Sequence, residues 1–104
     1  MSGLKLPARL RMDGARAAWA QMSPALRAEA AQVLAAAGRE VRLSAAGLTD
    51  FDSSALSLLL SAARQCSEQG ATLKLEDAPE KLRELARVYG VSELFWGPSP
   101  AAQA

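Results

Sequence analysis

The middle of the chain constrains the fold most strongly, because two short β-prone segments flank one helix-forming segment. Val41 and Leu43 alternate with charged neighbours, and residues 72–75 form the second β-prone segment. Between them, residues 53–69 are rich in Leu and Ala, and Gly70 follows, a residue common just past a helix end. A strand, helix and strand in this order predict a sheet with the helix packed on it.

The N-terminal segment alternates apolar and polar residues with a period of two. This pattern predicts one half-buried strand over residues 4–12. Pro7 has no N–H for a strand ladder, so an edge or a bulge is expected there. The expected inward-facing side chains are Leu4, Leu6, Ala8, Leu10 and Met12.

Two further segments carry helix signals. Residues 15–37 are rich in alanine, and Ser23 and Pro24 predict a break into two helices, with Ser23 as an N-cap. Pro79 is expected to open another helix, which ends at Gly90. We therefore expect a single α/β domain over residues 1–96, a small mixed β-sheet with helices packed on it. Residues 97–104 are rich in Pro, Ala and Ser and are expected to form a disordered C-terminal tail.

Composition narrows the possible functions. The chain has 104 residues, a formal net charge of +1, one cysteine and no histidine. The lack of histidine excludes Ser-His and Cys-His catalysis and histidine-bound metals. The small net charge disfavours nucleic acid as a partner. No apolar run approaches the roughly 20 residues of a membrane span. We expect a cytoplasmic binding protein without enzymatic activity, cofactor, metal or direct membrane insertion.

The candidate binding site begins at the start of the central helix, with Asp52, Ser53 and Ser54. Asp52 or Ser53 is expected to accept hydrogen bonds from the first free N–H groups of the helix. That end of a helix also carries partial positive charge, which suits an anionic group or an acceptor from a partner.

The rest of the candidate site depends on how the central helix is rotated. Helical spacing places Leu56, Leu59, Leu60 and Ala63 on one side, the expected core stripe. The opposite side contains Ser54, Leu58, Ser61 and Gln65. We therefore expect Leu58 and Ser61 to contact a partner, with Leu58 pointing away from the core.

An ordered set of segments carries a family resemblance. It comprises residues 41–43, the Asp-Ser-Ser-Ala-Leu run at 52–56, the leucines at 58–60, and the segments 69–75 and 82–95. This set resembles the STAS domain, the fold of bacterial anti-sigma factor antagonists. The resemblance covers residues 41–96 best and implies a module that binds other proteins.

The sequence, which is rich in alanine and leucine and contains no histidine, looks most like one branch of that family, the MlaB proteins. The likeness implies a partner, the MlaF-like ATPase subunit of an ABC transporter for phospholipid, with Ser53 and Ser54 near the contact. The implied role is to support phospholipid trafficking that maintains outer-membrane lipid asymmetry. The implied location is cytoplasmic, peripheral to the inner membrane through that partner and part of an inner-membrane complex.

A second branch gives the alternative function, a phosphoregulated antagonist that binds an anti-sigma factor kinase. In that branch the position of Ser54 takes a phosphate from the kinase. Ala55 stands where that branch usually has Gly, and Ser44 stands where it prefers an acidic residue. These departures argue against phosphorylation of Ser54.

Overall fold

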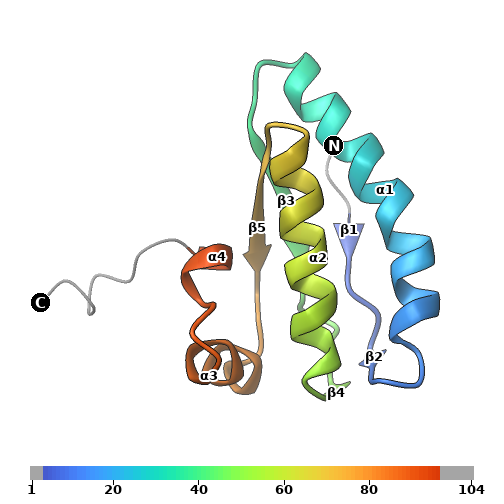
Figure 1. The fold of residues 1–104 in the computed structure, drawn as a ribbon, viewed down its shortest axis with the longest axis vertical. Helices are drawn as coiled ribbons and strands as arrows, with labels where there is room; N and C mark the ends of the chain where they lie inside the picture. The colour runs from blue at the N-terminus through green and yellow to red at the C-terminus, as the bar shows by residue number, and fades with distance from the viewer. Residues whose placement is uncertain (1–3, 97–104) are drawn as a thin grey trace, which may run out of the picture.

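The structure is a computed structural model in which residues 4–96 are described. The expected C-terminal tail, residues 97–104, lies outside the described residues. Two strands precede each of the two long helices, and one further strand precedes two shorter helices (Figure 1). The elements are β1 (Leu4–Lys5), β2 (Arg9–Leu10), α1 (Ala15–Ala35), β3 (Glu40–Ser44), β4 (Asp50–Phe51), α2 (Ser54–Glu68), β5 (Thr72–Glu76), α3 (Glu80–Val88) and α4 (Glu93–Trp96).

The strands form two small parallel sheets. The larger sheet has three strands in the order β1-β3-β5, and β2 pairs with β4 in a sheet of two strands. The α/β fold class is confirmed. The expectation of a mixed sheet is wrong for residues 4–96, because every strand pair there is parallel. Helices α1 and α2 connect successive strands of the larger sheet, and such crossovers return the chain in the same direction.

One face of the larger sheet forms the core. Val41 and Leu43 of β3 and Leu73 and Leu75 of β5 are buried, and α1 and α2 contact these strands. The alternate residues of β3 and β5 carry charges that form ion pairs across the opposite face, including Arg42 with Glu76 at 3.8 Å. The sheet is therefore buried on one side and polar on the other.

The expected strand over residues 4–12 divides into β1 and β2 around Pro7. β1 pairs with β3, whereas β2 pairs with β4, so the chain changes partners at the residue that cannot donate to a ladder. Leu6 and Leu10 are buried as expected. Ala8 lies between β1 and β2 and is exposed, and Met12 lies after the end of β2 and is 76% exposed.

The expected break at Pro24 does not occur. α1 is one helix from Ala15 to Ala35 with Pro24 inside it, and Ser23 is not an N-cap. Met22 and Leu26 are buried on either side of the proline, so one packed face continues across it. Pro24 is exposed, and its missing N–H leaves the Ala20 carbonyl without its usual helical donor at a position where water has access. Tertiary packing has overridden the local signal.

The C-terminal elements follow the sequence signals more closely. Pro79 is the N-cap of α3, and Gly90 follows the helix with a φ of +74°, a conformation that favours glycine. Phe95 of α4 is buried, so this segment covers part of the core as expected. Trp96 donates from Nε1 to the Leu75 carbonyl at 3.0 Å, which ties α4 to β5. Within residues 4–96, no helix combines the length and apolarity needed to cross a membrane.

Candidate protein-interaction surface

Asp52 organises the start of α2. Its Oδ1 accepts from the backbone N–H of Ser54 at 2.8 Å, and its Oδ2 accepts from the backbone N–H of Met12 at 3.1 Å. These two donors, Met12 first and Ser54 second, lower the pKa of the Asp52 carboxyl. The carboxylate therefore both caps α2 and holds the loop between β2 and α1 against it.

The two serines lie at this end of α2, as expected. Ser53 is exposed and occupies the N-cap position, but its side chain makes no capping hydrogen bond. Ser54 is partly buried and gives its N–H to Asp52. Of the two capping residues considered from the sequence, Asp52 performs the role, and the Ser53 side chain is left on the surface.

The expected orientation of Leu58 is wrong. Leu58 is only 4% exposed and belongs to the hydrophobic core, and Gln65 is 9% exposed. The reason is that α2 packs on the sheet and also along α1, so it buries a wider arc than one stripe. Leu56 and Leu59 are buried as expected.

The exposed side of α2 lies about one residue step from the predicted one. Ser57, Ser61 and Arg64 are exposed and, at spacings of four and three, lie on one face of the helix. Ser53 continues this row at the N-terminal end. We name these four residues the α2 face. Ser61 was expected on the surface; Ser57 and Arg64 were missed because their exposure depends on where α1 packs.

Met12 adds an apolar side chain beside this face. Its backbone N–H binds Asp52, which places it next to the start of α2, and its side chain is 76% exposed. The period-two pattern had placed Met12 in the core. The Asp13-Gly14 turn signal directly after it was the available hint that the strand ends earlier.

The geometry has the features of a surface for protein contact: small hydroxyl side chains, one arginine and an exposed, adaptable methionine. A family model described as "Mlab, STAS domain" matches residues 3–95. The chain belongs to the STAS domain family. No curated protein and no solved structure gave a significant match. STAS domains are in general binding domains, so the family indicates a role in protein interaction.

Asp50 and Asp52, the acidic residues near the α2 face of this STAS domain, bind different groups. Asp50 accepts from Arg11 at 2.8 Å and lies 3.6 Å from Arg9, whereas Asp52 binds backbone N–H groups. Arg9 also pairs with Asp13 at 3.0 Å, and its hydrogen bond lowers the pKa of that carboxyl. Among residues 4–96, no group of three or more His, Cys, Asp and Glu side chains is placed to hold a metal ion. Acidic and basic side chains here pair with one another, so the surface beside α2 has no strong net charge.

The phosphorylation hypothesis for this STAS domain concerns Ser54. The residue is partly buried, and the Asp52 carboxylate caps the same helix end. A phosphate on Ser54 would add negative charge close to that carboxylate, which is unfavourable. Ser53 lies beside it and is exposed.

Proposed function

We propose that this STAS domain is a non-catalytic subunit that binds and supports the ATPase of an ABC transporter for phospholipid trafficking. The observation that carries the proposal is the match of residues 3–95 to a family model whose description names Mlab. The MlaB-like run from Asp52 to Leu60 supports the same branch. The partner is an MlaF-like ATPase subunit, and the role is maintenance of lipid asymmetry in the outer membrane.

The proposed contact is the α2 face together with Met12. Small side chains such as Ser57 and Ser61 let a partner helix or loop approach the α2 backbone closely. Met12 then supplies an apolar anchor at the edge, and methionine adapts its shape to the surface that it meets. Arg64 provides a charged group at the other end, suited to a carboxylate on the ATPase.

The domain itself would sit in the cytoplasm, peripheral to the inner membrane and attached through the ATPase. A subunit that binds only the folded ATPase stabilises that folded state by mass action. A non-catalytic subunit can support an enzyme in this way. The proposal therefore predicts a stabilised or more active ATPase in the complex, with no ATP turnover by the STAS domain alone.

The decisive experiment is co-expression with the cognate transporter ATPase and, separately, with a candidate anti-sigma factor kinase. We expect a stoichiometric complex with the ATPase on size-exclusion chromatography, and a higher melting temperature for the ATPase within it. Recovery of a complex with the kinase, together with transfer of phosphate to Ser54, would establish the alternative function. Isothermal titration of the STAS domain alone with ATP should show no sub-micromolar binding.

A further inference from the structure

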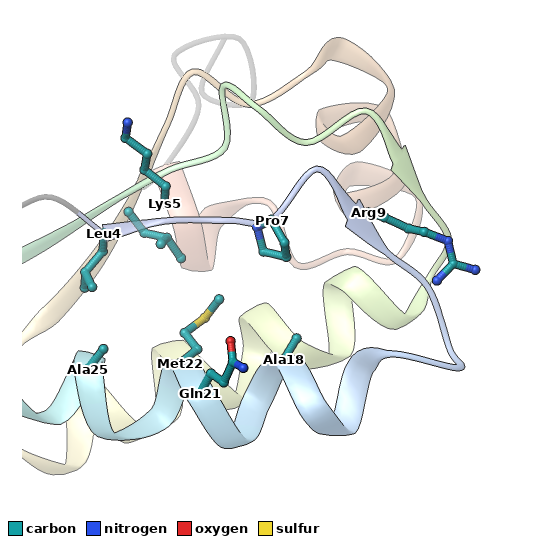
Figure 2. A pocket seen from close by; sticks show the side chains of 9 residues that line it. Leu4, Lys5, Pro7, Arg9, Ala18, Gln21, Met22 and Ala25 are labelled. Atoms are coloured by element: carbon teal, nitrogen blue, oxygen red, sulfur yellow. The ribbon is translucent and has the colours of Figure 1, made fainter.

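Helix α1 extends past β1, an edge strand of the larger sheet, and leaves a groove beneath it. β1 is at one end of the strand order, and α1 lies on its outer side (Figure 1). The groove has a volume of about 350 Å³. Figure 2 shows the N-terminal strand on one side of it and α1 on the other, with the side chain of Met22 directed toward the strand. The apolar lining comes from Leu4, Pro7 and Leu43 on the sheet side and from Ala18, Met22 and Ala25 on α1.

The backbone along this groove has an unused hydrogen-bonding edge. The Leu6 N–H donates to the Ser44 carbonyl of β3 at 2.8 Å. Because peptide groups alternate in direction along a strand, the N–H and carbonyl of Lys5 face away from β3. Within residues 4–96, β3 is the sole strand paired with β1. A free donor and acceptor therefore lie at the same edge as the groove.

We propose that an extended segment of a partner protein adds to this edge as a strand beside β1. The distance between neighbouring strands is about 4.8 Å, so the added strand would lie beneath the overhanging part of α1. Every second side chain of the segment would point into the groove, and an aliphatic side chain suits its lining. A free fatty acid such as laurate would contact the apolar lining but leave the backbone donor and acceptor of Lys5 unpaired.

The charges favour a segment with an acidic residue. Lys5 is exposed, and its side chain points away from the groove in Figure 2. Among residues 4–96, no ion pair includes Lys5, whereas Arg9, near the other end of the groove, already pairs with Asp13 and Asp50. A glutamate or aspartate opposite Lys5 on the added strand would form a favourable cross-strand pair.

A second copy of this chain fits the edge less well. Two-fold antiparallel pairing centred on this edge places Lys5 opposite Lys5, and like charges in that position are destabilising. Lys5 and Pro7 also protect the edge against indiscriminate pairing. The edge is thus selective for a different chain that carries the complementary charge.

The test uses the full chain labelled with ¹⁵N and a set of ten-residue peptides that alternate valine with polar residues. One series has glutamate among the polar positions, one has lysine and one has only threonine. We expect the glutamate series to shift the backbone amide signals of Lys5 and Met22 and to bind most tightly at low salt. Methylation of alternate peptide nitrogens should abolish binding, because it removes the donors that pair with β1.

Two variants test the site itself. Ala25→Phe fills the groove and should weaken the best peptide by about tenfold or more, whereas Ala31→Phe, exposed on the same helix and outside the groove, should not. Lys5→Glu should reverse the preference between the glutamate and lysine series. The proposal is overturned if no peptide shifts the Lys5 amide at millimolar concentration, or if Ala25→Phe binds as wild type. It is equally overturned if only laurate, or only self-association of the chain, perturbs the groove.

Discussion

Gln65 of α2 binds Ser23 of α1 through both atoms of its side-chain amide. Its Oε1 accepts from the Ser23 hydroxyl at 2.7 Å, and its Nε2 donates to the Ser23 carbonyl at 2.8 Å. Both residues lie where the two helices pack together, and Gln65 is the buried polar residue of the described core. This pair fixes how α2 is rotated against α1, and so determines which residues of α2 reach the surface.

Removing the Gln65 amide should destabilise the domain. Gln65→Ala leaves the Ser23 carbonyl and hydroxyl without their partner in a partly buried position, which costs about 1–3 kcal/mol. Urea denaturation followed by circular dichroism measures the loss. Ser23→Ala removes one of the two bonds and should cost less, and the double variant should lose less than the sum of both. Additive losses would show that the two residues are not coupled.

Replacing Pro24 should stabilise the domain. Pro24 is exposed within α1 and cannot donate to the Ala20 carbonyl, so Pro24→Ala restores one helical hydrogen bond. The gain is at most about 3 kcal/mol, the usual cost of proline inside a helix. A thermal melt gives the result, with Ala25→Gly as the opposite control in the same turn. A lower melting temperature for Pro24→Ala would mean that the proline limits the unfolded chain more than it disturbs α1.

The exposed and buried sides of α2 should respond differently to a charge. Leu58→Asp places a carboxylate in the core and should prevent folding, since Leu58 is 4% exposed. Ser57→Asp, one residue earlier and on the α2 face, should melt close to wild type. If the proposed function is right, Ser57→Asp should also weaken capture of the ATPase by about tenfold. Normal capture by a folded Ser57→Asp variant would move the contact away from the α2 face.

Local patterns were sufficient to predict the central strands and their buried residues. Val41, Leu43, Leu73 and Leu75 alternate with polar residues, and this alternation requires only that one face of the strand be covered. The Asp52 cap was likewise visible, because an aspartate within two residues of a helix start can accept one of its free N–H groups.

The rotation of α2 and the continuity of α1 depend on contacts between segments far apart in the chain. Leu58 and Gln65 are buried because α1 covers a second side of α2, and the spacing of residues within α2 does not reveal that neighbour. Pro24 is accommodated because Met22 and Leu26 pack on both sides of it. Met12 was misplaced because the period-two pattern was extended past Leu10, where β2 ends.

Cys66 should be unreactive while the domain is folded. Its side chain is buried, and burial raises the pKa of the thiol, so little reactive thiolate forms near neutral pH. Ellman's reagent should therefore label the folded protein slowly and the urea-unfolded protein at once. Rapid labelling under native conditions would show that α2 opens readily from the sheet.

Asp52 should make the domain sensitive to acid in a defined direction. The pKa of this carboxyl is lowered in the folded state by the N–H groups of Met12 and Ser54, so the ionised form favours folding. That contribution is complete above the ordinary pKa of an aspartate and is lost as the pH falls through the lowered value. Asp52→Asn keeps one acceptor oxygen and loses the charge, so its melting temperature should be lower than wild type at neutral pH.

The difference between Asp52→Asn and wild type should shrink as the pH falls, because the wild-type carboxyl also becomes neutral. Thermal melts from pH 7 down to about pH 2 follow this convergence. Asp13→Asn is the matched control: the pKa of Asp13 is also lowered, but its partner is the exposed Arg9 and not the backbone at the start of α2. We expect Asp13→Asn to melt near wild type, since exposed ion pairs contribute little. If the difference in melting temperature between Asp52→Asn and wild type stays constant at every pH, the lower stability of the variant comes from altered packing or hydrogen-bond geometry and not from the lost carboxylate charge. The α2 start would then be held by packing, and the loop that carries Met12 would not depend on the charge of Asp52.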